Sequence, residues 1–142
     1  MPADSPASPT VGVLGLHSSK ETKAILNAVE ALGYDTEWLR RENIAVSIDD
    51  GDLTVEPAVD VIANRLLLST STHPADDIGL ARLFDNLYPM LNRPAPVTTA
   101  MHKFATAAAL ADAGIPVPDA LLALSSERLN TGRQTSVPQR SS

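Results

Sequence analysis

The stretch VGVLGLHSSKETKAILNAVEALG, residues 11–33, decides the fold of this chain. Its first part, VGVLGL at 11–16, is a short apolar run with β-branched residues, which is typical of a strand covered on both faces. Ser18 and Glu21 then form a Ser-x-x-Glu capping box, and apolar residues recur at helical spacing until Gly33 ends the pattern. A strand, a capped helix and a glycine predict the start of a βαβ unit.

Further short apolar runs, bounded by turn residues, predict the remaining strands. They lie at residues 35–39, 44–48, 53–55, 59–63, 90–91 and 120–124. The Asp50-Gly51 pair between two of these runs suits a tight turn. We therefore expect a hairpin at the edge of the sheet.

Two more helices are predicted between these strands. One covers about residues 74–88 and has a proline in its first turn. The prolines at 94–96 break the pattern, and the next helix is capped by Thr98 or Thr99 and runs to about Ala113. Strands that alternate with helices predict an α/β fold with an open, mostly parallel sheet.

The composition is that of one globular domain that is not embedded in a membrane. The chain has 142 residues, 44% of them hydrophobic and 20% charged, and no apolar run approaches the roughly 20 residues that span a bilayer. The opening MPADSPASPT has no basic cluster followed by an apolar core, so we expect no secretory signal in it. We expect residues 1–9 to be disordered and the protein to be cytoplasmic.

Charge and cysteine content narrow the choice of function. The net charge of −6 repels polyanions, and no basic stripe is present to neutralise a phosphate backbone, so we expect no nucleic-acid partner. The sequence has no cysteine, which removes disulfides, thiolate catalysis and cysteine-ligated metals. An acidic bias with few lysines is typical of proteins from salt-loving microbes.

Polar side chains follow two predicted strands at the points where these end. His17 and Ser18 lie between the first strand and its helix, where free backbone N–H groups favour anions. Asn64 and Arg65 follow the strand at 59–63, and an arginine there can clamp a carboxylate with two hydrogen bonds. We predict that these four residues bind a substrate or another small anion. Helix capping and a surface ion pair are the structural alternatives.

No pattern in the sequence marks a catalytic centre or a metal site. The glycines near the first strand fit neither Gly-x-Gly-x-x-Gly nor the phosphate loop. The three histidines lie far apart in the sequence, and the aspartates of the predicted hairpin lack the closing glutamate of a calcium loop. We therefore assign no catalytic residue and no metal ligand.

An ordered series of residues follows the strand at 90–91. It consists of Asn92-Arg93-Pro94, then Met101-His102-Lys103-Phe104, then Ala113-Gly114-Ile115-Pro116-Val117-Pro118. Here the chain resembles the start of an ATP-grasp ligase of the RimK-like or glutathione-synthetase-like group. In that family a short strand ending near Asn leads to a helix with a lysine and then to a Gly-Ile-Pro-x-Pro corner. The matching positions are Lys103, Gly114, Ile115, Pro116 and Pro118.

The resemblance implies a division of the chain and a chemistry. Residues 10–92 would form the pre-ATP-grasp α/β domain, and residues 93–124 the start of the nucleotide-binding region. Lys103 would contact the phosphates of ATP, which acts with magnesium in the full-length family. Such enzymes join a small-molecule or peptide carboxylate to an amine, often an amino acid, through an acylphosphate. His102 stands where the family often has an acid.

Several family elements are not in the sequence. These are the second nucleotide lysine, the glycine-rich flap, the adenine-binding segment, and the acidic and Asn residues that hold two magnesium ions. We therefore expect this chain to be inactive alone. The protein partners that we expect are a further copy of the chain, in a homo-oligomer, or the missing carboxyl-terminal lobe. Residues 125–142 change to Arg, Ser, Thr, Gln and Pro, which predicts a disordered tail and suggests a truncated or frameshifted ligase. The alternative is a stand-alone α/β module that binds an anionic small molecule or a partner subunit.

Overall fold

The computed structural model describes residues 7–128, and the chain divides into two compact units between Val97 and Thr98. In chain order the elements are β1 (Thr10–Leu14), α1 (Lys20–Ala31), β2 (Asp35–Leu39), β3 (Ala45–Asp49), β4 (Asp52–Glu56), β5 (Val61–Asn64), a 3-10 turn (Leu68–Thr70), α2 (Pro74–Leu87), β6 (Met90–Leu91), α3 (Pro94–Met101) and α4 (Lys103–Asp112). In the part of the chain that the structure describes, no helix has both the length and the apolar character needed to cross a membrane.

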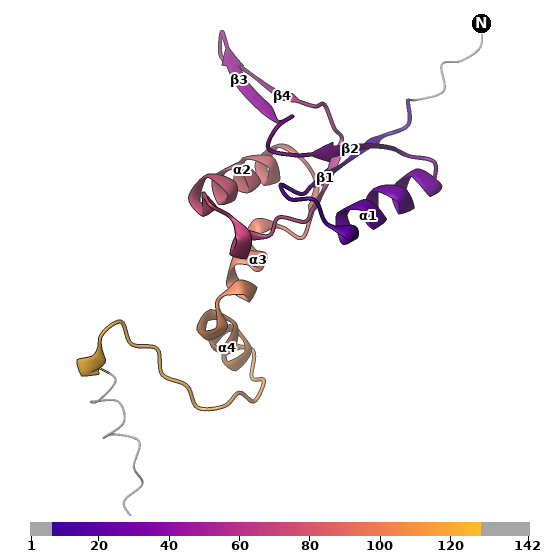
Figure 1. The fold of residues 1–142 in the computed structure, drawn as a ribbon. Coiled ribbons are helices and arrows are strands. Elements are labelled where there is room, and N and C mark those ends of the chain that lie inside the picture. The colour runs from indigo at the N-terminus through magenta and orange to yellow at the C-terminus, as the bar shows by residue number, and fades with distance from the viewer. Residues whose placement is uncertain (1–6, 129–142) are drawn as a thin grey trace, which may run out of the picture. The chain divides into compact units, whose positions relative to one another are not determined.

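The first unit is built on a four-stranded sheet in the order β2-β1-β5-β6, and every neighbouring pair is parallel. This confirms the predicted α/β fold with an open parallel sheet. β1 and β5 lie at the centre, in a register that places Leu14 beside Asn64. Parallel neighbours need a crossover, and α1 and α2 supply it on opposite sides of the sheet (Figure 1).

The core of this unit lies between the sheet and α2. Leu14, Leu39 and Ile62 of three neighbouring strands are fully buried, and they pack in one cluster with Ala81 and Phe84 of α2. The ring of Phe84 also meets Tyr88 edge to face, with centroids 6.0 Å apart. Because apolar positions three residues apart share one face of a helix, residues 81 and 84 both point at the sheet.

The hairpin has the predicted tight turn but not the predicted place. Asp50 and Gly51 have φ angles of 52° and 87°, the left-handed values that a two-residue turn of type I′ requires. The expected position at the sheet edge is wrong, because within residues 7–128 β3 and β4 pair only with each other, as a separate antiparallel sheet. Figure 1 shows this hairpin standing away from the four-stranded sheet.

The second half of the chain departs further from the sequence prediction. Pro94 does not break a helix but begins α3. Proline is tolerated there because the N–H groups of the first turn have no hydrogen-bond partner within the helix, so the N–H that proline lacks is not needed. The expected helix is split, and His102, rather than a threonine, caps α4 by accepting a hydrogen bond from the Ala105 N–H at 3.1 Å. The strand predicted at 120–124 is wrong, since these residues have no regular structure and no strand beside them among residues 7–128.

Gly114 forms the corner after α4. Gly114 has a φ of 76°, and its N–H donates to the Ala111 carbonyl at 3.0 Å. The Ile115 N–H donates to the Leu110 carbonyl at 2.9 Å, which completes a glycine cap of the helix end. Residues 7–9 and 125 are without regular structure and residues 126–128 are helical, while the other residues of both predicted disordered ends lie outside the described range.

Candidate functional site

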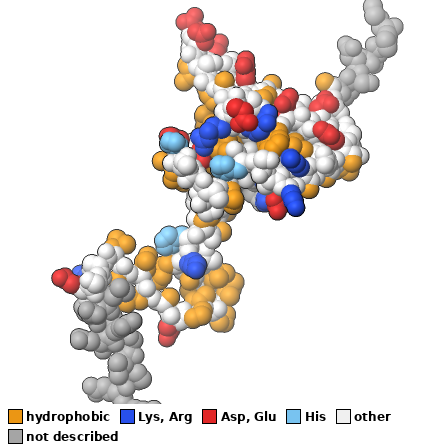
Figure 2. Space-filling view, in the orientation of Figure 1, with side chains coloured by type: hydrophobic (Ala, Val, Ile, Leu, Met, Phe, Trp, Pro, Cys, Tyr) orange, Lys and Arg blue, Asp and Glu red, His pale blue; other side chains and the backbone are white. Residues whose placement is uncertain are grey.

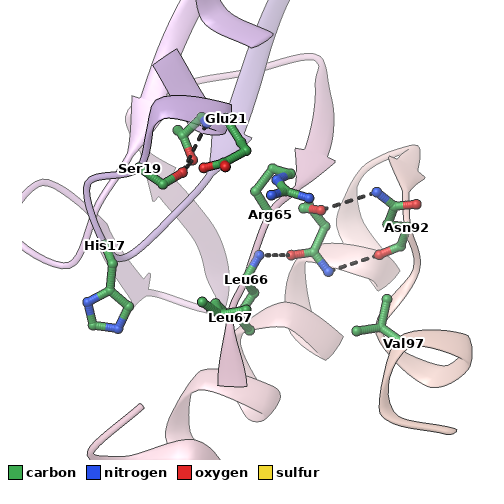
Figure 3. A pocket seen from close by; sticks show the side chains of 10 residues that line it. His17, Ser19, Glu21, Arg65, Leu66, Leu67, Asn92 and Val97 are labelled. Carbon is green, nitrogen blue, oxygen red and sulfur yellow. Dashed lines mark hydrogen bonds between the residues drawn. The ribbon is translucent and has the colours of Figure 1, made fainter. Parts of the chain in front are cut away.

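A pocket of about 340 Å³ opens at the carboxyl ends of the two central strands. The chain leaves β1 through α1 toward β2 on one side, and leaves β5 through α2 toward β6 on the other. The strand order therefore reverses between β1 and β5, and open α/β sheets bind ligands in the crevice at such a point. The lining side chains, shown in Figure 3, are His17, Ser19, Glu21, Thr22, Asn64, Arg65, Leu66, Leu67, Asn92 and Val97.

The structure brings together three of the four residues predicted to bind an anion. His17, Asn64 and Arg65 all line this pocket, although they come from two different loops. Ser18 is exposed and does not line the pocket. The neighbouring Ser19 takes its place, because Ser19 is the residue that caps α1.

The first turn of α1 forms one wall. The Ser19 Oγ accepts a hydrogen bond from the Thr22 N–H at 3.1 Å and lies 3.0 Å from the Thr22 Oγ1. The predicted capping box with Ser18 is therefore wrong by one residue. Thr22 is 1% exposed and packs against Gly15, where an added Cβ would lie 3.0 Å from the Thr22 Oγ1. A residue without a side chain at position 15 is thus what allows α1 to start so close to β1.

Glu21 places a fixed negative charge at this wall. Hydrogen bonds from its own backbone N–H and from the Ser19 hydroxyl hold the pKa of the Glu21 carboxyl below its ordinary value. Desolvation opposes this shift, and the nearby charge of Arg65 adds the smallest contribution to it. The carboxylate is therefore ionised at neutral pH and satisfies the amino end of the helix. Sequence reasoning read Glu21 only as part of a cap and missed that it lines the pocket.

Arg65 provides the positive charge. It is exposed, it follows β5 directly, and its backbone N–H donates to the Leu14 carbonyl at 2.8 Å, which fixes the start of its loop. Among the described residues, the Arg65 guanidinium forms no ion pair within 4.0 Å. Its five N–H donors are therefore free for a ligand.

The opposite wall is held by two asparagines. Asn64 is 4% exposed, its side-chain amide donates to the Asn92 carbonyl at 2.9 Å, and its side-chain oxygen accepts from the Leu66 N–H at 3.0 Å. The Asn92 amide donates back to the Asn64 carbonyl at 3.4 Å. Asn92 has a φ of 61°, a left-handed value that asparagine tolerates better than most residues. Asn64 thus ties the ends of β5 and β6 together rather than offering its side-chain oxygen to a ligand.

Lys103 belongs to the second unit. It is the first residue of α4 and is exposed, and it does not line the pocket. The residues from 7 to 128 contain no group of three or more His, Asp or Glu side chains that could hold a metal ion. The aspartates at the hairpin tip form no such group.

No protein-family model matches this chain, and no curated protein matches it either. The resemblance to ATP-grasp ligases thus stays a prediction from the residues themselves, and the function has to be argued from the pocket.

Proposed function

We propose that the pocket binds a small carboxylate, with Arg65 as its anchoring cation. The observation that carries this proposal is an arginine without an ion-pair partner among the described residues, in a pocket at the point where the strand order reverses. A guanidinium recognises a carboxylate through two parallel hydrogen bonds. The volume of about 340 Å³ suits a metabolite-sized molecule.

The charges in the pocket favour a carboxylate over a polyphosphate. Glu21 already occupies the amino end of α1, so a phosphate there would meet a second negative charge. A ligand with a single carboxylate can bind Arg65 and leave Glu21 in place. A ligand that also carries a positive group should bind more tightly, since that group can face the Glu21 carboxylate.

The remaining residues shape the site around this contact. Leu66, Leu67 and Val97 give the pocket an apolar side, which suits the carbon skeleton of a ligand. The Asn92 amide has a second N–H besides the one that it donates to Asn64, and it can donate to a ligand oxygen. His17 stands at the exposed rim (Figure 3).

The resemblance to ATP-grasp ligases supports a role of this carboxylate site in an enzyme. We propose as a second step that the chain is the amino-terminal, substrate-binding portion of an ATP-grasp carboxylate–amine ligase, in which Lys103 contacts ATP phosphates and magnesium acts with the nucleotide. Support comes from α4, which begins at an exposed Lys103 and is followed by the left-handed Gly114. His102 caps the helix in the place of the family's acid, so the helix does not need that acid in order to start. A stand-alone binding module remains the alternative, and both require the pocket.

Calorimetric titration tests the carboxylate site. Succinate and L-glutamate are titrated into the wild-type chain, into Arg65→Gln, and into Arg82→Gln, a matched loss of one exposed arginine outside the pocket. A hydrogen bond to a charged group contributes about 1.5–3 kcal/mol, so Arg65→Gln should weaken binding by roughly 10- to 100-fold. Arg82→Gln should bind like the wild type. Equal affinities in all three proteins would overturn the proposal.

The enzymatic step has its own test. We expect no ATP-dependent ligation of either carboxylate to an amine by these 142 residues alone, because the family's magnesium-binding residues are not in the sequence. Turnover of ATP to ADP with product formation would contradict this expectation. That result would not contradict the proposed carboxylate site, which the calorimetric titration tests separately.

A further inference from the structure

The β3–β4 hairpin has one apolar and one polar face. Opposite residues pair as Val46 with Val55 and Ile48 with Leu53, so these four side chains share a face. The other face carries Ala45, Ser47, Asp49, Asp52, Thr54 and Glu56. Ile48 is 75% exposed and Leu53 39%, although Val55 packs on the core at the base. An isolated two-stranded sheet with an uncovered apolar face is marginal in water.

The outer edge of β3 is free to pair with another strand. Among residues 7–128, β3 has β4 as its sole partner. Asp49 and Asp52 form the pair next to the two-residue turn, and in such a hairpin this pair exchanges backbone hydrogen bonds. Along the two strands, hydrogen-bonded pairs alternate with pairs that exchange no hydrogen bonds. Val46 and Ile48 lie in the intervening pairs, so their backbone N–H and C=O groups point outward from β3.

These outward groups select one symmetric register. If two copies of β3 run antiparallel with Ser47 opposite Ser47, then Val46 of each copy faces Ile48 of the other. Each of these two pairs joins residues whose backbone groups point outward, so both can exchange hydrogen bonds. The apolar faces of the two hairpins then join into one continuous surface. The two acidic tips lie at opposite ends of the seam, away from each other.

Charge distinguishes the β3 edge from the β4 edge. The same symmetric pairing through β4, centred on Thr54, would place Asp52 directly opposite Glu56 of the second copy. Like charges directly opposite each other destabilise a sheet. Pairing through β3 places Asp49 opposite the uncharged Ala45 instead, near the base of the hairpin. At this base Arg40 forms an ion pair with Glu42 at 3.4 Å and stays 42% exposed. Figure 2 shows how strongly acidic side chains gather at the hairpin tip.

We propose that the chain forms a homodimer in which the hairpins of two copies pair through their β3 edges into a four-stranded antiparallel sheet. The partner is a second copy because the free backbone groups and the charges of this edge are self-complementary under a two-fold axis at Ser47. The pocket takes no part in this contact, so the dimer does not depend on the proposed carboxylate site.

Sedimentation velocity on the full chain at rising concentration tests the dimer. Proline at position 48 removes an outward N–H from the β3 edge, and proline at position 53, its cross-strand partner, does the same on the β4 edge. We expect a dimer for the wild type and Leu53→Pro, and a monomer for Ile48→Pro, with similar circular dichroism for all three. A wild-type monomer at every concentration, or a monomeric Leu53→Pro, would overturn the proposal.

A second experiment does not depend on how the hairpin tolerates proline. The chain has no cysteine, so Ser47→Cys and Thr54→Cys each introduce a single thiol. At the two-fold axis, the Ser47 Cα atoms of the two copies would lie about 4.5 Å apart, within the range that a disulfide spans. Mild oxidation should give a covalent dimer of Ser47→Cys but little of Thr54→Cys. Equal cross-linking of both variants, or none, would contradict the register.

Discussion

Replacing Gly15 with alanine tests the close approach of α1 to the end of β1. An ideal Cβ at this position lies 3.0 Å from the Thr22 Oγ1 and 3.2 Å from the Thr22 Cγ2. Thr22 is 1% exposed and is held by Ser19, so it cannot swing away into solvent. The amino end of α1 therefore has to shift, and this end forms a wall of the pocket.

The expected loss of stability follows from two opposing effects. Adding a methyl group to a packed site costs about 1–3 kcal/mol, while alanine in place of glycine stabilises by about 0.4–1 kcal/mol by restricting the unfolded chain. Gly79→Ala in α2 is the matched control, since an added Cβ there meets no atom within 4 Å. The unfolded-state effect is common to both variants. We therefore expect Gly15→Ala to be less stable than Gly79→Ala by about 1–3 kcal/mol.

Urea denaturation of both variants measures this difference, provided that the slope with denaturant stays constant. The double variant Gly15→Ala/Thr22→Ala removes the atoms that clash with the new Cβ, so the two substitutions should couple favourably. Gly15→Ala should also weaken succinate binding because it displaces the α1 wall. If Gly15→Ala were as stable as Gly79→Ala and showed no coupling to Thr22→Ala, the packing argument would be wrong.

Two further substitutions test the walls of the pocket. Asn64→Ala leaves the Leu66 N–H and the Asn92 carbonyl without their partner, so we expect a loss of about 1–3 kcal/mol in urea denaturation. Glu21→Gln removes a carboxylate whose pKa is lowered, and such a group stabilises the fold above its ordinary pKa of 4.5. Thermal unfolding should therefore show Glu21→Gln to be less stable than the wild type at pH 7. This difference in stability should vanish as the pH falls below 4.5 through the lowered pKa of Glu21. A difference that stays constant across this range would contradict the lowered pKa.

The elements around the central strands could be predicted from the sequence because local patterns determine them. β2 has the predicted bounds, and α2 begins at the predicted proline. The turn at Asp50-Gly51 also formed as expected, since few residue pairs accept two left-handed positions. The position of the hairpin relative to the four-stranded sheet was not predictable from the sequence. It depends on the direction that the chain takes after β2 and not on the pattern within the hairpin.

Patterns in the second half misled for a different reason. The run at 120–124 has strand-like residues, but a strand exists only with a partner, and the residues described by the structure give it none. Prolines were read as helix breakers, yet Pro94 is at the start of a helix, where proline is favoured. Proline alone does not distinguish these two positions.

Most of the candidate site could be located because strand ends in a parallel sheet share one edge. His17, Asn64 and Arg65 were placed by this rule alone. Their individual roles were not predictable. The inward turn of the Asn64 side chain toward Asn92 depends on the position of β6, and Glu21 enters the pocket only because Ser19, one residue after the expected cap, starts the helix.

The most direct test of the carboxylate site is a nuclear magnetic resonance titration of the ¹⁵N-labelled chain with succinate. We predict saturable shifts of the backbone amides that surround the pocket, above all those of Ser19, Glu21 and Arg65, while the amides of the β3–β4 hairpin stay unchanged. Shifts that are absent, or that are spread over the chain without saturation, would contradict a carboxylate site at the ends of β1 and β5.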